Sequence, residues 1–139
     1  MILVVDIGNT TVSFGGVTVS PRGEYRVTFT TKLDTDPNWD PADYTVALIK
    51  KLRALGRERE SFTGIVISSV VPKVLDTVRE SMLSVFGLEP LIVTCESDLG
   101  ISLEVSEPHK VGRDRLADAA WAAAHYPLPL VTVDLGTAT

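Results

Sequence analysis

The sequence contains a single cysteine, Cys95, among its 139 residues. One thiol cannot form an intramolecular disulfide, and it cannot supply the ligands of a cysteine-based metal site. Long apolar runs are also missing, since no stretch approaches the roughly 20 apolar residues that a membrane-spanning helix needs. The apolar residues 2–5 meet Asp6 at once, without a basic leader or a cleavage site. These absences favour a cytoplasmic protein over an exported or membrane-inserted one.

Positive charge is scarce as well. The chain has 13 Lys and Arg residues against 18 Asp and Glu residues, for a net charge of -5. Its only basic cluster is Lys50, Lys51 and Arg53, on one expected helix. We therefore expect neither nucleic acid nor an anionic membrane as the main partner. The remaining composition, 45% hydrophobic and 22% charged, is typical of a globular chain with one compact core.

The hydrophobic pattern predicts strands followed by alternating helices and strands. Apolar and β-branched runs between turn residues predict strands, and runs with helical spacing predict helices. Asp40 is expected to cap a helix that begins at Pro41, and Gly87 to end one that begins at Pro72. The expected strands are 2–5, 12–19, 24–31, 64–69, 91–94 and 128–133, with 101–105 as a further candidate, and the expected helices are 41–55, 72–86 and 114–125. This order, β-β-β-α-β-α-β-α-β, predicts an α/β sandwich with a mixed sheet.

One pattern occurs twice in the sequence, at an offset of 128 residues. Residues 3–11 read LVVDIGNTT, and residues 131–139 read VTVDLGTAT. Each copy has an apolar strand, an aspartate, an apolar residue, a glycine and small hydroxyl residues. The offset is too long for a solenoid repeat. It suits a duplicated domain, so we expect a first domain at 1–127 and the start of a second, truncated domain at 128–139.

The repeated element can bind phosphate. Asp6 ends a buried strand, and a turn with Gly8 follows it directly. Free backbone N–H groups in such a turn, with the side chains of Asn9, Thr10 and Thr11, can cradle phosphate oxygens, while the carboxylate holds a hydrated cation. The alternative is a plain hairpin, because Gly8 and Asn9 are also ordinary turn residues.

The segment 111–115, VGRDR, is the third feature with chemical meaning. Asp114 is expected at a helix N-terminus, where the helix dipole keeps the carboxylate ionised and able to take a proton from a bound hydroxyl. Gly112 allows a substrate to approach the backbone, and Arg115 offers a fork for a carboxylate. The alternative is that Asp114 only caps the helix and that Arg115 pairs along it with Asp118.

Together, four segments resemble the motifs of type III pantothenate kinases, in that family's order and spacing along the whole chain. They are DIGNT at 6–10, ISSVVP at 67–72, GRDR at 112–115 and DLGTAT at 134–139. The resemblance implies a ribonuclease H-like, actin-like ATPase fold in two duplicated domains, and a homodimer. It also implies ATP-dependent phosphorylation of pantothenate to 4'-phosphopantothenate, the first step of coenzyme A synthesis.

The resemblance further implies a role for each matching residue. Asp6 would lie near Mg²⁺, Asp114 would be the general base, and Asp134 would bind an activating monovalent cation, K⁺ or NH4⁺. The ATP-binding set would be Asp6, Ile7, Gly8, Asn9, Thr10, Thr11, Val12, Ser13 and Thr137, and the pantothenate-binding set would be Val105, Gly112, Arg113, Asp114 and Arg115.

Two positions depart from the family pattern. The family usually shows Tyr and Asn ahead of the Gly-x-Asp-Arg motif, where this chain has Val105 and Glu107. A kinase for another small hydroxyl acceptor therefore stays open, as does a non-catalytic regulatory paralogue. Because family members continue well past the second phosphate loop, we expect an N-terminal fragment that has no kinase activity alone.

Overall fold

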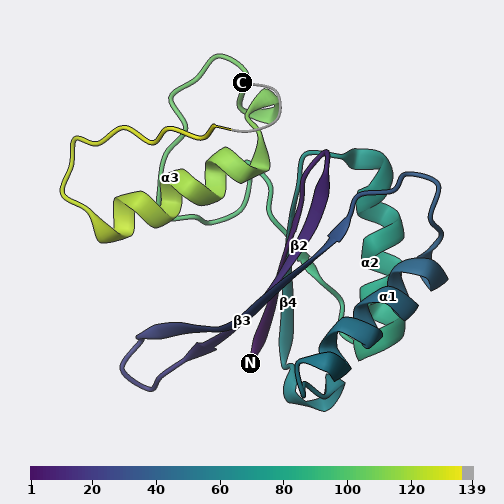
Figure 1. Ribbon diagram of the computed structural model, residues 1–139. Helices are drawn as coiled ribbons and strands as arrows, with labels where there is room; N and C mark the ends of the chain where they lie inside the picture. Colours follow the sequence, from purple (N-terminus) through teal and green to yellow (C-terminus); the bar gives the residue numbers. More distant parts are fainter. Residues whose placement is uncertain (136–139) are drawn as a thin grey trace.

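The computed structural model describes residues 1–135 as a mixed five-stranded sheet with helices on both of its faces (Figure 1). The sheet order is β3-β2-β1-β4-β5. The strands are β1 Ile2–Ile7, β2 Thr11–Val19, β3 Tyr25–Asp34, β4 Gly64–Ser69 and β5 Leu91–Ile92; the helices are α1 Pro41–Ala54, α2 Pro72–Phe86 and α3 Arg113–His125, with 3-10 turns η1 Arg59–Ser61 and η2 Pro108–Lys110. The predicted fold class, α/β with a mixed sheet, is confirmed, and the elements follow the predicted order as far as α3.

Strand β1 lies at the centre of the sheet. It pairs antiparallel with β2 and parallel with β4, and β3 extends the antiparallel side, as the predicted meander requires. In the parallel pair, Asp6 lies opposite Ser68. Because parallel strands end at the same edge of a sheet, the carboxyl ends of β1 and β4 meet there.

The hydrophobic core covers one face of the sheet. Leu3, Val5 and Ile7 alternate along β1 and are completely buried against α1 and α2. Side chains alternate between faces along a strand, so Val4 and Asp6 point to the opposite face, where α3 lies (Figure 1). The core thus fixes the direction of Asp6.

Local sequence signals determine the ends of α1 and α2. Asp40 and Asp43 form a capping box, and Pro41 and Pro72 occupy first helical positions. Gly87, with φ of 66°, ends α2 in the left-handed conformation. These predicted boundaries are confirmed. Within residues 1–135, no helix has both the length and the apolar character that crossing a bilayer requires.

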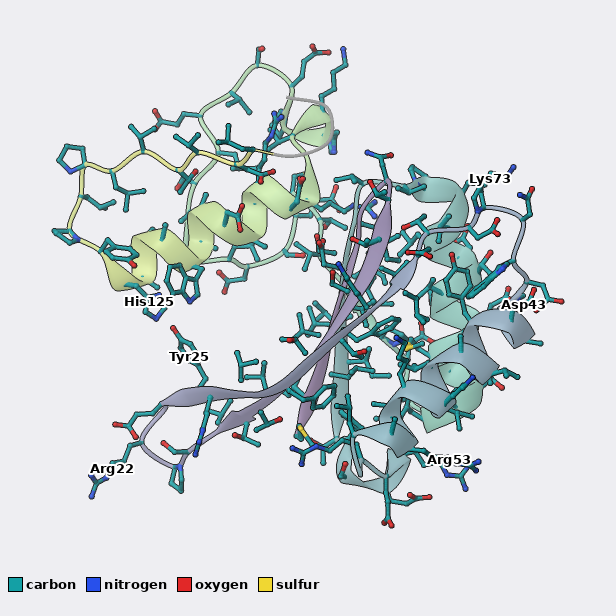
Figure 2. The ribbon with its side chains drawn as sticks, in the orientation of Figure 1. Arg22, Tyr25, Asp43, Arg53, Lys73 and His125 are labelled. Carbon is teal, nitrogen blue, oxygen red and sulfur yellow. The ribbon has the colours of Figure 1, made fainter. Side chains whose placement is uncertain are left out.

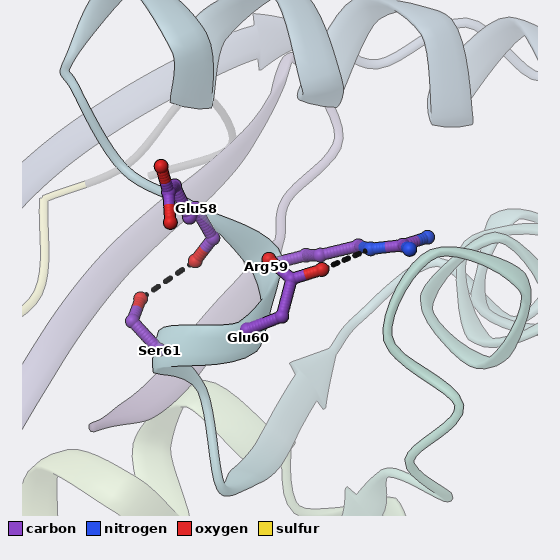
Figure 3. A network of polar contacts seen from close by, with 4 residues as sticks. All are labelled: Glu58, Arg59, Glu60 and Ser61. Atoms are coloured by element: carbon purple, nitrogen blue, oxygen red, sulfur yellow. Dashed lines mark hydrogen bonds and ion pairs between the residues drawn. The ribbon is translucent and has the colours of Figure 1, made fainter.

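The 3-10 turn η1 leads into β4 and is stabilised by local contacts. The Ser61 hydroxyl donates to the Glu58 carbonyl at 2.6 Å, and Arg59 pairs with Glu60 at 2.6 Å (Figure 3). The ion pair is exposed, and such pairs contribute little stability. The turn connects α1 to β4.

Two predicted strands are absent from the described residues. The segments 101–105 and 128–133 form no ladder, and Val131 and Val133 are 88% and 76% exposed. An apolar run becomes a strand only when a neighbouring strand satisfies its backbone groups, and within residues 1–135 no strand pairs with either segment. Residues 136–139, the end of the second repeat copy, lie outside the described residues. The division into domains at 127 stays a prediction.

Candidate functional site

A cleft of about 860 Å³ lies between the carboxyl ends of β1 and β4 and the first half of α3. The described part of its wall comes from the end of β1 and the following turn, the end of β4, the approach to α3, and the segment after α3. That last segment turns back along the helix (Figure 1). Clefts at the carboxyl ends of parallel strands are common ligand sites in α/β proteins.

The three carboxylates singled out in the sequence all line this cleft. Asp6 comes from β1, Asp114 from the first turn of α3, and Asp134 from the returning segment. More than a hundred residues of sequence separate Asp6 from Asp114 and Asp134, and the tertiary structure brings the three to one site.

The turn between β1 and β2 is both a hairpin turn and a part of the cleft wall. The backbone N–H of Gly8 donates to the Thr11 carbonyl at 2.9 Å. From the side of β3, Thr35 donates its hydroxyl to the Gly8 carbonyl at 2.7 Å and its backbone N–H to the Thr10 carbonyl at 2.9 Å. The turn is therefore held in place while Asn9 stays exposed at the cleft.

Three residues of the predicted ATP set do not line the described cleft. Ile7 and Val12 have no exposed surface and belong to the core, so only their backbone could reach a ligand. Ser13 lines a second cavity, on the face of the sheet opposite to α1 and α2. Thr137 lies outside the described residues.

The start of α3 holds Asp114 in a defined position. Gly112 is the N-cap residue and offers no side-chain hydrogen bond, and the Asp114 carboxylate accepts the backbone N–H of Arg115 at 2.8 Å. Asp114 therefore satisfies one free N–H of the first turn while it lines the cleft. The alternative pairing of Arg115 with Asp118 is not formed, because the Arg115 guanidinium makes no ion pair within the described chain.

Two residues of the predicted pantothenate set lie outside the described cleft wall. They are Arg113, at the first position of α3, and Val105, which is 50% exposed in the preceding loop. Lys110 lies at the cleft instead, and it pairs with Glu107 at 2.7 Å. Glu107 thus contacts a cationic side chain of the cleft.

Negative charge accumulates in the cleft. Burial raises the pKa of Asp6, the nearby Ser68 hydroxyl lowers it, and the carboxylates of Asp114, Asp118 and Asp134 raise it again. Asp6 keeps solvent contact on one side, while the atoms packed on the other side desolvate it. Burial also raises the pKa of Asp118, with further contributions from Asp134 and Asp114. Such a cluster favours binding of a cation.

The sequence reading did not assign a site role to Asp118 or Ser68. Asp118 follows Asp114 by four residues on α3, a spacing that places both on one helix face and could have indicated a shared site. Ser68 is only 8% exposed, and its hydroxyl forms no hydrogen bond of normal geometry with the described residues. Its place in the cleft follows from the pairing with Asp6, which sequence alone does not give.

The chain matches the family model of type III pantothenate kinase over residues 2–139. It is 37% identical over 139 residues to the type III pantothenate kinase of Acidiphilium cryptum (strain JF-5), covering all of this chain and 50% of that protein. It is 33% identical over 140 residues to that of Bifidobacterium animalis subsp. lactis (strain AD011), covering all of this chain and 53% of that protein. The chain spans about half the length of the curated relatives it matches.

A solved structure of similar fold is the Thermus thermophilus RuvC structure. The TM-score is 0.51 with 13% sequence identity, over 88% of this chain and 92% of that chain. At this identity the likeness concerns the fold alone, and it agrees with the α/β class seen in the sheet.

Proposed function

The chain belongs to the type III pantothenate kinase family, and on that premise we propose that the full-length protein transfers the γ-phosphoryl group of ATP to the primary hydroxyl of pantothenate. The product is 4'-phosphopantothenate, and the reaction is the first step of coenzyme A synthesis. One observation carries the proposal: Asp6, Asp114 and Asp134 line one cleft together with the β1–β2 turn.

The β1–β2 turn is the proposed phosphate-binding element. Gly8, Asn9, Thr10 and Thr11 line the cleft beside Asp6, and the contacts of Thr35 hold the turn rigid. Backbone N–H groups and small hydroxyl side chains bind phosphate oxygens without large rearrangement. Thr137, in the second copy of the repeat, completes the proposed ATP contacts.

Asp114 is the proposed general base. As the oxygen of pantothenate bonds to the γ-phosphorus and the bond to ADP breaks, Asp114 takes the hydroxyl proton. Its bond to the Arg115 N–H orients the carboxylate, and Gly112 leaves the space that it occupies. The Arg115 guanidinium, free of ion pairs within residues 1–135, binds the pantothenate carboxylate.

The donors of the cleft suit Mg²⁺, because carboxylate and hydroxyl oxygens are the ligands that this hard cation prefers. Asp6 would hold the ion, whose charge would neutralise the negative charge that develops on the phosphates during transfer. In the described chain, no three His, Cys, Asp or Glu side chains form a metal site by themselves. That arrangement suits an ion that keeps waters and takes ligands from the nucleotide. Asp134 is the proposed site for K⁺ or NH4⁺.

A second candidate is a kinase for another small hydroxyl acceptor. It is favoured by Val105, which lies outside the cleft wall, and by Glu107, which pairs with Lys110 at its rim. Homodimer formation and a cytoplasmic location are further parts of the proposal that rest on family membership.

The test is an ADP-release assay on the full-length protein with ATP, Mg²⁺ and K⁺. Pantothenate is compared with other small alcohols and hydroxy acids, and mass spectrometry identifies the phosphorylated product. We expect turnover with pantothenate. Turnover with a different acceptor alone would reassign the substrate, and failure to bind ATP at high concentration with K⁺ present would favour a regulatory paralogue.

A further inference from the structure

Asp118 is a carboxylate of the cleft to which the proposed reaction gives no role. It lies one turn beyond Asp114 on α3 and lines the same cleft as Asp6 and Asp134. It makes no hydrogen bond or ion pair with any residue between 1 and 135. Asp114 bonds to a free N–H of the first helical turn, whereas the second turn offers no such donor to Asp118. Its carboxylate therefore remains available to a ligand.

Ser68 points independently to a polar ligand at the same place. The residue is 8% exposed, lines the cleft, and lies opposite Asp6 in the parallel pair. The hydroxyl has no hydrogen-bond partner of normal geometry in the described chain. Leaving a buried hydroxyl unpaired costs free energy, which a bound ligand or an ordered water recovers.

The balance of charge identifies the kind of ligand. Four carboxylates line the described cleft, and its cationic side chains are Lys110 and Arg115, of which Lys110 already pairs with Glu107. A triphosphate bound to the adjacent turn adds further negative charge. Cations between the nucleotide and the acidic wall would offset this repulsion.

We propose that Asp118 is the second carboxylate of the divalent-cation site, binding from α3 an ion that Asp6 binds from β1, and that the Ser68 hydroxyl holds a water of this ion's hydration shell. The inference rests on the proposed function in taking a nucleotide-bound divalent cation as the ligand. The proposed cation site has two carboxylates and several waters, in keeping with the ordinary coordination of Mg²⁺.

The test measures Mn²⁺ binding to the full-length protein with ADP present and pantothenate absent, by electron paramagnetic resonance of free Mn²⁺. Asp118→Asn is expected to weaken Mn²⁺ binding by at least about 10-fold, because loss of even an outer-shell partner of a metal ligand typically costs 10- to 100-fold. Ser68→Ala is expected to weaken it less, in the same direction. The control is Asp76→Asn, which removes an exposed carboxylate from α2, away from the cleft, and leaves the affinity unchanged.

Thermal unfolding checks that each variant is folded, and Asp118→Ser provides a second replacement without a carboxylate. Wild-type Mn²⁺ affinity in folded Asp118→Asn or Asp118→Ser overturns the inference. The outcome is separable from the proposed function. If the protein phosphorylates pantothenate but binds Mn²⁺ equally well without the Asp118 carboxylate, only this inference is wrong. If Mn²⁺ binding requires Asp118 but pantothenate is not phosphorylated, only the proposed function is wrong.

Discussion

The Asp114 carboxylate occupies the space in which a side chain at Gly112 would begin. A Cβ atom built on Gly112 overlaps Oδ1 of Asp114, and the same oxygen accepts the backbone N–H of Arg115 at 2.8 Å. Gly112 has φ of -57° and ψ of 137°, values open to any residue. The glycine is therefore required by the neighbouring carboxylate and not by its own backbone conformation.

Replacing Gly112 with alanine is expected to displace the Asp114 carboxylate without disturbing the fold. Displacing a reacting group by about 1 Å can cost roughly 100-fold in rate, so we expect kcat to fall by about that factor in steady-state kinetics. Gly64→Ala is the matched control, because a Cβ there has nothing within 4 Å. Equal kcat values for the two variants would show that the overlap is relieved without moving Asp114.

Asp114→Asn is expected to remove the proposed base while keeping its contact with the helix. The asparagine oxygen can still accept the Arg115 N–H, so the unfolding temperature and the Mn²⁺·ADP affinity stay near wild type. Turnover falls by roughly 10² to 10⁴, the usual contribution of a general base. Near-normal ADP release from this variant contradicts the assignment.

Asp118→Asn is expected to stabilise the metal-free protein at neutral pH. Folding raises the pKa of Asp118 above its ordinary value of 3.8. Between the unfolded and the folded pKa, the folded state therefore binds more protons than the unfolded state, and the free energy of unfolding falls as the pH rises. The substitution removes this loss. Thermal unfolding in EDTA should show a higher Tm than wild type at pH 7, with the difference shrinking as the pH falls toward 3.8.

Two comparisons make this prediction specific. Asp76→Asn, outside the cleft, should show no such pH-dependent gain. Saturating Mg²⁺ with ADP should raise the Tm of wild type more than that of Asp118→Asn, because a ligand stabilises the state that binds it more tightly. A lower Tm for metal-free Asp118→Asn at pH 7 would mean that the carboxylate stabilises the empty fold.

Tyr25 links the β2–β3 hairpin to the end of α3. The Trp121 indole donates to the Tyr25 hydroxyl at 3.1 Å, the hydroxyl also contacts His125, and the Trp121 and His125 rings stack at 4.5 Å. Figure 2 shows the Tyr25 and His125 side chains pointing toward each other across the gap between these elements. The contact fixes the end of α3 opposite to the cleft.

Removing the Tyr25 hydroxyl should therefore loosen α3. Tyr25→Phe is expected to lower the free energy of unfolding by about 0.5 to 1.5 kcal/mol, the usual net value of a hydrogen bond, as measured by urea titration. Tyr126→Phe is the control, since that exposed hydroxyl makes no hydrogen bond with the described residues. If both variants unfold at the same urea concentration, the hairpin does not support the helix.

The sequence by itself determined the elements whose signals are local. Pro41 with Asp40 began α1, Pro72 began α2, and Gly87 ended it, because a cap or a breaker acts within one helical turn. It also indicated Asp6, Asp114 and Asp134, because each lies in a short motif of residues adjacent in the sequence. A predicted strand at 128–133 failed because a strand needs a partner, which no local pattern supplies.

Only the tertiary structure decided which side chains share the cleft. Ser68 lies beside Asp6 because β4 pairs parallel with β1 in one register, and a shift of one residue would turn it toward the core. Asp118 lines the same cleft as Asp6 because α3 lies on the face of the sheet opposite to α1 and α2. Both relationships depend on how distant segments pack, and the free energy of that packing belongs to the whole fold rather than to any stretch of sequence.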